Sequence, residues 1–203
     1  LKDLGHLQEA ELSTRKAIAL KPDFAEAHFN LGLIFFDLGK LQEAEVSTRK
    51  AIQLKPHFAE AYSNLGSILK DLGKLQEAEV STRKAIQLKP DLADAHSNLG
   101  SILNDLGKLQ EAEISYQKAI QLKPDLAEAH YNLGNIFLNI RKFDNAIASF
   151  NKASEMGMDS NRCLAGIGNV LLAKGNHAEG VAKLKEGEGA IKLDLNHGLS
   201  LHS

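Results

Sequence analysis

The sequence has a single cysteine, Cys163, no tryptophan and only four prolines among its 203 residues. One cysteine excludes an internal disulfide framework and fits a reducing compartment, so we expect a cytoplasmic location. The longest dense apolar stretch, residues 31–36, is broken by Gly32 and is far too short to span a bilayer. We therefore expect neither a membrane protein nor a disulfide-stabilised secreted domain.

Neither sign of charge dominates the sequence, which carries 24 lysine and arginine residues against 26 aspartate and glutamate residues. The formal net charge of −2 supplies no basic field of the kind that binds the phosphates of a nucleic acid. We expect no nucleic-acid partner and no membrane partner.

The sequence consists largely of one unit repeated along the chain. Residues 59–92 and 93–126 differ at only six positions, and four prolines recur in step with them. The period is about 34 residues, which is typical of helix–turn–helix solenoids. The prolines that mark it are Pro22, Pro56, Pro90 and Pro124.

Small residues recur inside the unit at places where two helices must touch. Glycine holds the eighth place, at Gly32, Gly66, Gly100, Gly134 and Gly168. Alanine holds the twentieth place, at Ala10, Ala44, Ala78, Ala112 and Ala146, and the twenty-seventh, at Ala17, Ala51, Ala85, Ala119 and Ala153. With leucine at the seventh place and proline at the thirty-second, the pattern resembles the tetratricopeptide repeat family over nearly the whole chain. The fourth place, commonly aromatic in that family, departs from it and holds histidine in three repeats.

The resemblance implies an all-α fold, a right-handed α-solenoid in which antiparallel helix pairs stack into a superhelix. Because each repeat of a solenoid contacts only its neighbours, we expect one elongated domain with a thin, continuous core. The period divides the chain into a partial first repeat (second helix) at 1–24, repeats at 25–58, 59–92 and 93–126, a degenerate repeat at 127–160, a degenerate helix pair at 161–186 and a tail or following domain at 187–203.

The chain opens with Leu1 inside a repeat, as an excised fragment would. We expect residues 1–5 to be the last turn of a first helix and residues 6–20 to be the second helix. The apolar side chains of that second helix have lost part of their cover, so the sequence predicts head-to-tail self-association through this incomplete repeat. These side chains are Leu7, Ala10, Ala17 and Ile18.

The pattern also changes near the other end. Gly187 and Gly189 disfavour a continued helix, and apolar and polar residues alternate over 191–196 as in a strand. This strand is either the start of another domain or part of a tail that caps the last helix.

Each repeat carries local start and stop signals. Asp23, Asp91 and Asp125 each precede an acid by three places, which predicts capping boxes, and glycines at 39, 73 and 107 predict left-handed helix ends. The Lys-Pro step should stop the second helix. Glutamate and arginine four residues apart predict small, solvated ion pairs on it, namely Glu11–Arg15, Glu45–Arg49 and Glu79–Arg83.

No recognisable catalytic or metal-binding constellation stands out in the sequence. His28, His96 and His130 occupy equivalent places in different repeats, and stacked helices lie roughly 8–10 Å apart, too far for these side chains to share an ion. Cys163 has no histidine or acid at a catalytic spacing, which favours a buried thiol. We therefore expect no enzyme, no metal and no cofactor.

Asparagine occupies the sixth place of four successive first helices, a set that we call the asparagine column: Asn30, Asn64, Asn98 and Asn132. Asparagine is a mediocre helix former, so its recurrence in mid-helix needs a reason. One reason is that the side chains tie neighbouring repeats together. The other is that they bind the N–H and C=O groups of an extended partner chain. The column is similar to the asparagine ladder in the superhelical tetratricopeptide arrays of O-GlcNAc transferases, which implies a peptide-binding role.

Residues flanking the column would set the preference for a partner. The second place is acidic, as is most of the thirteenth, so a neutral to basic segment should bind best. The second-place acids are equally well explained as helix caps. Phe29, Phe36 and Tyr131 suggest apolar anchors near both ends of the groove. The acids are Glu26, Glu60, Asp94 and Glu128 at the second place and Asp37, Asp71 and Asp105 at the thirteenth.

The sequence therefore predicts a protein–protein interaction module that binds an extended or helical segment of a partner protein. Two alternatives stay open. The chain could be the substrate-recruiting arm of a longer enzyme, with a glycosyltransferase-, sulfotransferase- or oxygenase-like domain after residue 189, or a self-associating scaffold.

Overall fold

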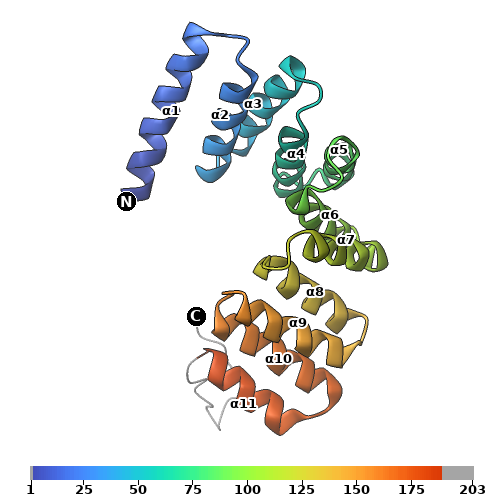
Figure 1. Ribbon diagram of the computed structural model, residues 1–203. Helices are drawn as coiled ribbons and strands as arrows, with labels where there is room; N and C mark the ends of the chain where they lie inside the picture. Colours follow the sequence, from blue (N-terminus) through green and yellow to red (C-terminus); the bar gives the residue numbers. More distant parts are fainter. Residues whose placement is uncertain (1, 189–203) are drawn as a thin grey trace. The chain divides into compact units, whose positions relative to one another are not determined.

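The computed structural model describes residues 2–188, and these form eleven α-helices (Figure 1). Successive helices pair into antiparallel hairpins, as the period predicted, and the all-α solenoid is confirmed. None of these helices is long and apolar enough to cross a membrane. The helices are α1 (Lys2–Leu20), α2 (Ala25–Asp37), α3 (Leu41–Leu54), α4 (Ala59–Asp71), α5 (Leu75–Leu88), α6 (Ala93–Asp105), α7 (Leu109–Leu122), α8 (Ala127–Asn139), α9 (Phe143–Glu155), α10 (Ser160–Lys174) and α11 (His177–Glu188).

The chain divides into two compact units rather than the single domain expected from the sequence. Unit 1 ends at Leu122 and contains α1 to α7, and unit 2 begins at Lys123 and contains α8 to α11. A solenoid has no core shared by all of its repeats, so compactness is a property of neighbouring repeats only.

The two helices of a repeat approach closely because their contact residues are small. Ala78 and Ala85 of α5 are completely buried. A Cβ atom on Gly66 would collide with the Thr82 hydroxyl, and one on Gly100 would lie 2.9 Å from the ring of Tyr116. Glycine at the eighth place is therefore required for this close approach.

Between these contacts, the core is a series of small apolar clusters, each of which spans two repeats. One cluster joins Leu31 and Phe35 of α2 to Ile68 of α4. The next joins Leu69 of α4 to Ile102 of α6. This is the thin strip of core expected for a solenoid, and because Ala44 and Ala78 belong to these clusters, it buries apolar surface both within and between repeats.

The turns between paired helices follow the glycine signals. Gly39, Gly73 and Gly107 have φ angles of 70°, 75° and 73°, and Lys40 N donates to Phe35 O at 2.8 Å to close the turn after α2. These left-handed helix ends confirm the prediction. In unit 2 the same turn is made by Arg141, which has a φ of 61° without being glycine.

The predicted capping boxes are wrong. α2 and α6 begin after Phe24 and Leu92, and neither of these N-cap residues makes a side-chain capping bond. The first turn of α2 is closed by its backbone, with Ala27 N donating to Phe24 O at 3.1 Å. A side-chain cap occurs instead at α10, where Asn161 N donates to Asp159 Oδ1 at 3.0 Å.

Both end predictions differ from the structure. α1 runs through Gly5 without a turn, so residues 2–20 form one helix and not the end of one helix followed by a second. α11 continues through Gly187, where a Cβ atom would lie 2.5 Å from Asn161 O, so this glycine allows α10 and α11 to touch. The strand predicted within 191–196 lies outside the described residues.

The predicted ion pairs form, and two of them belong to networks of several charged residues, which the sequence did not predict. Glu79 accepts from Arg83 at 2.9 Å and also from Lys108 of the next repeat at 2.8 Å, and Arg83 reaches Glu111 at 2.7 Å. The same network recurs one repeat earlier, at Glu45. Because each network crosses from one repeat to the next, it stabilises their stacking. The central Glu45 and Glu79 are 14% and 15% exposed, whereas Glu77 and Glu111 are 59% and 52% exposed.

Candidate functional site

Unit 1 curves toward its first helices. The Cα atoms of α4 approach those of α6 within 8 Å, whereas α3 and α5 do not approach each other this closely. We call the face formed by α2, α4 and α6 the inner face, and the face formed by α1, α3, α5 and α7 the outer face. A curved array presents a concave surface on its inner face.

Three members of the asparagine column belong to unit 1. Asn30 is exposed, while Asn64 and Asn98 are half-buried. Asn64 Nδ2 donates to Thr48 Oγ1 at 3.4 Å, and Asn98 Nδ2 donates to Ser63 Oγ at 3.1 Å. These bonds are the ties between helices that one interpretation predicted. Each tie uses one N–H, so the other N–H and the carbonyl oxygen stay available for a partner.

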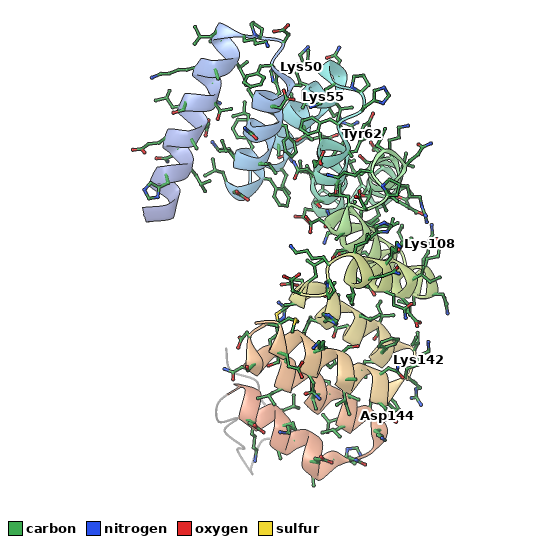
Figure 2. All side chains as sticks on the ribbon, viewed as in Figure 1. Lys50, Lys55, Tyr62, Lys108, Lys142 and Asp144 are labelled. Carbon is green, nitrogen blue, oxygen red and sulfur yellow. The ribbon has the colours of Figure 1, made fainter. Side chains whose placement is uncertain are left out.

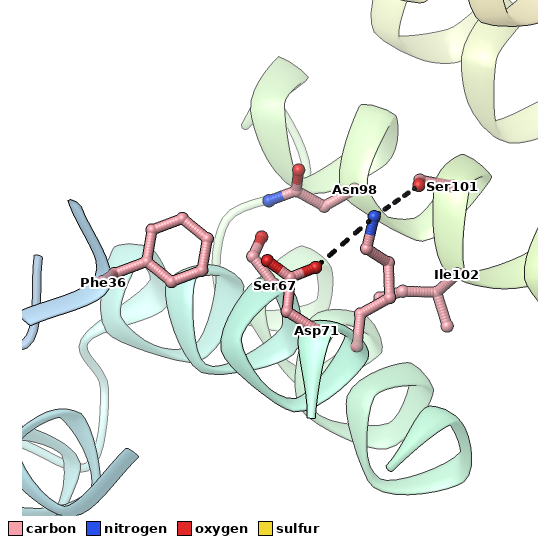
Figure 3. A pocket seen from close by; sticks show the side chains of 7 residues that line it. Phe36, Ser67, Asp71, Asn98, Ser101 and Ile102 are labelled. Carbon is pink, nitrogen blue, oxygen red and sulfur yellow. Dashed lines mark hydrogen bonds and ion pairs between the residues drawn. The ribbon is translucent and has the colours of Figure 1, made fainter. Parts of the chain in front are cut away.

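A pocket of about 220 Å³ lies among the first helices of unit 1. Figure 3 shows that it receives side chains from α2, α4 and α6. It brings together three predicted site residues, and we call it the inner pocket. Its lining consists of the predicted Phe36, Asp71 and Asn98 and of four further residues, Ser67, Lys70, Ser101 and Ile102.

The further lining residues include two serines at the ninth place of the repeat, a place that sequence analysis did not single out. Lys70 Nζ donates to Ser101 Oγ at 3.1 Å and lies 3.8 Å from Asp71 Oδ1 (Figure 3). The ammonium group therefore bridges α4 and α6 across the inner pocket. The signal for the serines was their recurrence one period apart, at Ser67 and Ser101.

Two of the second-place acids, in the first turns of α2 and α4, are paired with lysines. Glu26 Oε1 lies 2.6 Å from Lys55 Nζ, which follows α3 (Figure 2), and Glu60 makes the equivalent pair with Lys89 at 2.8 Å. The lysine hydrogen bond is the main cause that lowers the pKa of each carboxyl group below its ordinary value. These pairs remove two charges from the acidic flank predicted for the groove.

The thirteenth-place aspartates stay accessible. Asp37, Asp71 and Asp105 are exposed at the ends of α2, α4 and α6. Asp71 has Lys70 nearby, and Asp105 accepts a bond from Asn104 at 3.4 Å. The negative charge of the inner face therefore lies mainly along this edge. Asp94, at the second place of its repeat, is exposed as well.

The predicted aromatic anchors are placed differently from one another. Phe29 is half-buried, with its ring centroid 4.8 Å from that of Phe58. Phe36 is half-buried and packs on the core while also lining the inner pocket. Tyr131, in unit 2, packs on Phe150 and is covered by the Arg162 guanidinium at 4.3 Å. Phe36 is thus the anchor best placed to meet a ligand in unit 1.

The remaining predicted residues of unit 2 lie on α8. Asn132 is half-buried there, and Glu128 is paired with Arg162 at 3.6 Å. Arg162 therefore offsets the charge of Glu128 and covers Tyr131, so this helix offers a partner little beyond its carboxamide.

The described residues offer little for catalysis or metal binding. Within residues 2–188, no three His, Cys, Asp or Glu side chains are grouped so as to hold a metal ion. His28 and His96 bond through Nε2 to the carbonyl oxygens of Pro22 and Pro90, each at 2.9 Å, which makes them packing residues. Cys163 is buried, and burial raises its pKa, which disfavours the thiolate.

Comparison with protein-family models identifies these repeats. A model for the tetratricopeptide repeat matches residues 25–58, 59–92 and 127–156, and a model described as TPR repeat matches residues 1–39 and 100–140. The chain belongs to the tetratricopeptide repeat family. Comparison of this TPR protein with curated protein sequences gave no match.

Several solved TPR structures resemble this TPR protein. MamA is 29% identical, with a TM-score of 0.66 over 76% of this chain and 91% of its own. YrrB, described as a TPR protein with an unusual peptide-binding site, is 22% identical, with a TM-score of 0.68 over 91% of this chain and 93% of its own. PilF of Pseudomonas aeruginosa is 21% identical, with a TM-score of 0.79 over 93% of this chain and 87% of its own. At these identities, YrrB and PilF show the shared fold alone.

Proposed function

We propose that this TPR protein is a protein-interaction module without catalysis of its own, and that the inner face of unit 1 binds an extended segment of a partner protein. TPR repeats are typically interaction modules. The observation that carries the proposal is that Asn98, Phe36 and Asp71 line one pocket on the inner face. This pocket combines an apolar wall, a carboxylate and a carboxamide that can pair with a peptide backbone.

The spacing of the asparagine column suits an extended chain. Helices that stack about 10 Å apart meet an extended peptide, which rises about 3.3 Å per residue, at roughly every third residue. Asn30, Asn64 and Asn98 would then bind successive backbone groups without reading their side chains. We expect Asn132 to contribute the same chemistry on α8.

Preference for a partner sequence comes from the groups beside the column. The exposed aspartates at 37, 71 and 105 favour a basic side chain along one edge. Phe36, which is half-buried, favours an apolar side chain in the inner pocket. The preferred partner is therefore an extended segment that presents an apolar residue flanked by lysine or arginine.

The test removes two carboxamides together. Peptides selected from a random displayed library on the wild-type chain would be synthesised and titrated by fluorescence anisotropy. Asn64→Ala with Asn98→Ala should weaken binding by about 5- to 100-fold, because each lost hydrogen bond costs about 0.5–1.5 kcal/mol. Unchanged affinity for the selected peptides would remove the asparagine column from the binding site.

Two controls separate binding from folding. Asn151→Ala changes an exposed asparagine of α9 and should leave both binding and helix content unchanged. Asn98→Asp allows the Ser63 hydroxyl to donate to the new carboxylate, which preserves the tie between helices while removing the N–H donors. If Asn98→Asp binds peptides as the wild type does, the N–H groups of this side chain do not contribute to binding.

A further inference from the structure

The outer face of unit 1 carries an aliphatic residue that stands in solvent at the same place of every repeat. These side chains are 57–71% exposed, although each is a large hydrophobic residue in the middle of a helix. They are Leu12 of α1, Val46 of α3, Val80 of α5 and Ile114 of α7, and we call them the outer stripe. Single exposed apolar residues are ordinary, but four in register form a continuous feature.

Hollows lie beside the outer stripe, between consecutive second helices. The larger, of about 540 Å³, lies between α3 and α5, and its floor is made by Tyr62, Leu65 and Leu69 of α4. Another, of about 300 Å³, lies between α1 and α3 over Leu31 and Phe35 of α2. The two hollows are the same site moved by one repeat. The outer face therefore alternates an apolar ridge with an apolar hollow.

Arg49 and Glu77 at the rim of the larger hollow are already paired within the chain, whereas Lys84 donates to the neutral Gln87 at 3.0 Å. Arg49 donates to Glu45 at 2.9 Å and to Glu77 at 3.0 Å, and Glu45 also accepts from Lys74. A partner therefore gains little by presenting a positive charge. The hollow favours an aliphatic side chain instead.

The outer stripe is confined to unit 1. The places equivalent to Val80 hold Ala148 in α9 and Ala182 in α11, and both alanines are exposed. Unit 2 thus has the same helices without the apolar ridge. This contrast ties the ridge to particular side chains and not to the TPR fold in general.

We propose that the outer stripe is the interface of a two-fold symmetric dimer of this chain, in which the ridge of each copy packs into the hollows of the other. The occupant is a second copy because the ridge and the hollows share one spacing. Any other copy of unit 1 has ridges that match these hollows by construction, as a symmetric interface requires. The larger hollow lies between α3 and α5, beside Val80 and near the middle of the outer stripe, where the two-fold axis would pass. The proposal concerns the outer face and does not depend on the peptide groove.

The size of the face predicts a weak dimer. Helices of 14 residues are about 21 Å long, and four of them at least about 10 Å apart span about 30 Å, so each copy would bury about 600 Å². That area is below the roughly 800 Å² per partner of a stable interface, so the dimer should form in the micromolar range.

The test measures the mass of the full chain by sedimentation equilibrium, from low micromolar to several hundred micromolar concentration. The wild type should show a monomer–dimer equilibrium. Val46→Glu with Val80→Glu should weaken dimerisation at least about tenfold, because two carboxylates would be moved into an apolar contact. Both side chains are exposed, so helix content should not change. A wild type that stays monomeric, or a dimer that both substitutions leave intact, would overturn the proposal.

Matched variants distinguish this interface from other modes of association. Ala148→Glu changes the equivalent exposed place of unit 2 and should leave the dimer intact, and loss of the dimer in this variant would count against the outer stripe. Leu7→Glu changes the apolar side of α1, and if it alone abolishes association, the contact is head-to-tail. A chain with Val46→Cys and Val80→Cys should form a covalent dimer on oxidation, since the native Cys163 is buried. A double-cysteine chain that yields only monomer or mixed aggregates would contradict the two-fold arrangement.

Discussion

Units 1 and 2 are built from the same repeat, yet they pack their helix pairs in different ways. In unit 1 the eighth-place glycines Gly66 and Gly100 face Thr82 and the ring of Tyr116, whereas in unit 2 one ring, that of Phe150, faces both Gly134 of α8 and Gly166 of α10. Thr82 and Phe150 occupy the same place of their repeats, and both are completely buried. The comparison shows that the space left by glycine can hold either a small polar or a large aromatic side chain.

The units also differ in how neighbouring repeats are linked. Unit 1 uses networks of glutamate, lysine and arginine on its outer face, centred on Glu45 and Glu79. The place equivalent to Glu79 in unit 2 holds Ile147, which cannot accept such bonds. Unit 2 links its repeats through Phe150, which serves the contacts of α8 and of α10 at once, and through the ion pairs Glu128–Arg162 and Asp144–Lys174. Stability should therefore depend more on one buried ring in unit 2 than in unit 1.

The largest effect should follow from removing the ring on which unit 2 depends. Phe150→Ala should destabilise unit 2 by about 3–5 kcal/mol, because a fully buried aromatic ring leaves a cavity that the glycines beside it cannot fill. Amide hydrogen exchange of α8 to α11, followed by mass spectrometry, should show faster exchange there than in α2 to α5.

Thr82→Ala is the matched change in unit 1. It removes a hydroxyl that donates to Ala78 O at 2.9 Å and should cost about 1–2 kcal/mol, with faster exchange confined to unit 1. Equal losses from the two substitutions would mean that the ring is no more important than the hydroxyl.

Much of this fold could be predicted from the sequence because the repeat is explicit. Proline, glycine and alanine at fixed places specify where helices end and touch, and Gly39 and Ala78 behave as predicted. The capping boxes do not form because α2 and α6 begin after Phe24 and Leu92, one residue beyond Asp23 and Asp91. Backbone hydrogen bonds to Phe24 and Leu92 close the first turns. The acids expected to complete these boxes, such as Glu26, instead found lysines from the end of the same repeat.

An intermediate effect on stability is expected when the turn residues of the two units are exchanged. Arg141 has a φ of 61°, a conformation that costs a side-chain-bearing residue about 1 kcal/mol, so Arg141→Gly should stabilise unit 2 by up to that amount. Gly73→Arg places the same residue at a φ of 75°, where a Cβ atom meets nothing within 4 Å, and should cost a similar amount. Urea unfolding followed by circular dichroism measures both, and a stabilising Gly73→Arg would show that φ is not the cause.

The candidate site was less predictable than the fold. The asparagine column and Phe36 could be named from their spacing, because a first helix turns the same side chains inward in every repeat. Lys70 interrupts that pattern, and its bridge to Ser101 depends on the distance between α4 and α6, which no local sequence signal supplies. The outer stripe was missed for a related reason, since Val46 and Val80 look like core residues of an amphipathic helix until burial is known.

The smallest expected effect is on the pH dependence of the stability of unit 1, which unit 2 should not share. The pKa of Glu79 is lowered, first by its hydrogen bond from Lys108 and also by Arg83, against the opposing effect of burial. A carboxyl group whose pKa is lower in the folded state stabilises the fold above its ordinary pKa of 4.5, and this stability is lost as the pH falls through the folded value. Glu79→Gln should therefore reduce the loss of unit 1 stability between about pH 5 and pH 3 by less than about 1 kcal/mol, because its partners are partly exposed.

This last prediction is checked by urea unfolding of the full chain at each pH, with hydrogen exchange assigning the change to a unit. Exchange in α8 to α11 should respond equally to acid in the wild type and in Glu79→Gln, since Ile147 holds the equivalent place there. Glu9→Gln removes an exposed glutamate of α1 and controls for the change in net charge. If Glu9→Gln flattens the pH dependence as much as Glu79→Gln does, overall charge and not the network governs it. If only Glu79→Gln does so, the network centred on Glu79 contributes to the link between neighbouring repeats in unit 1.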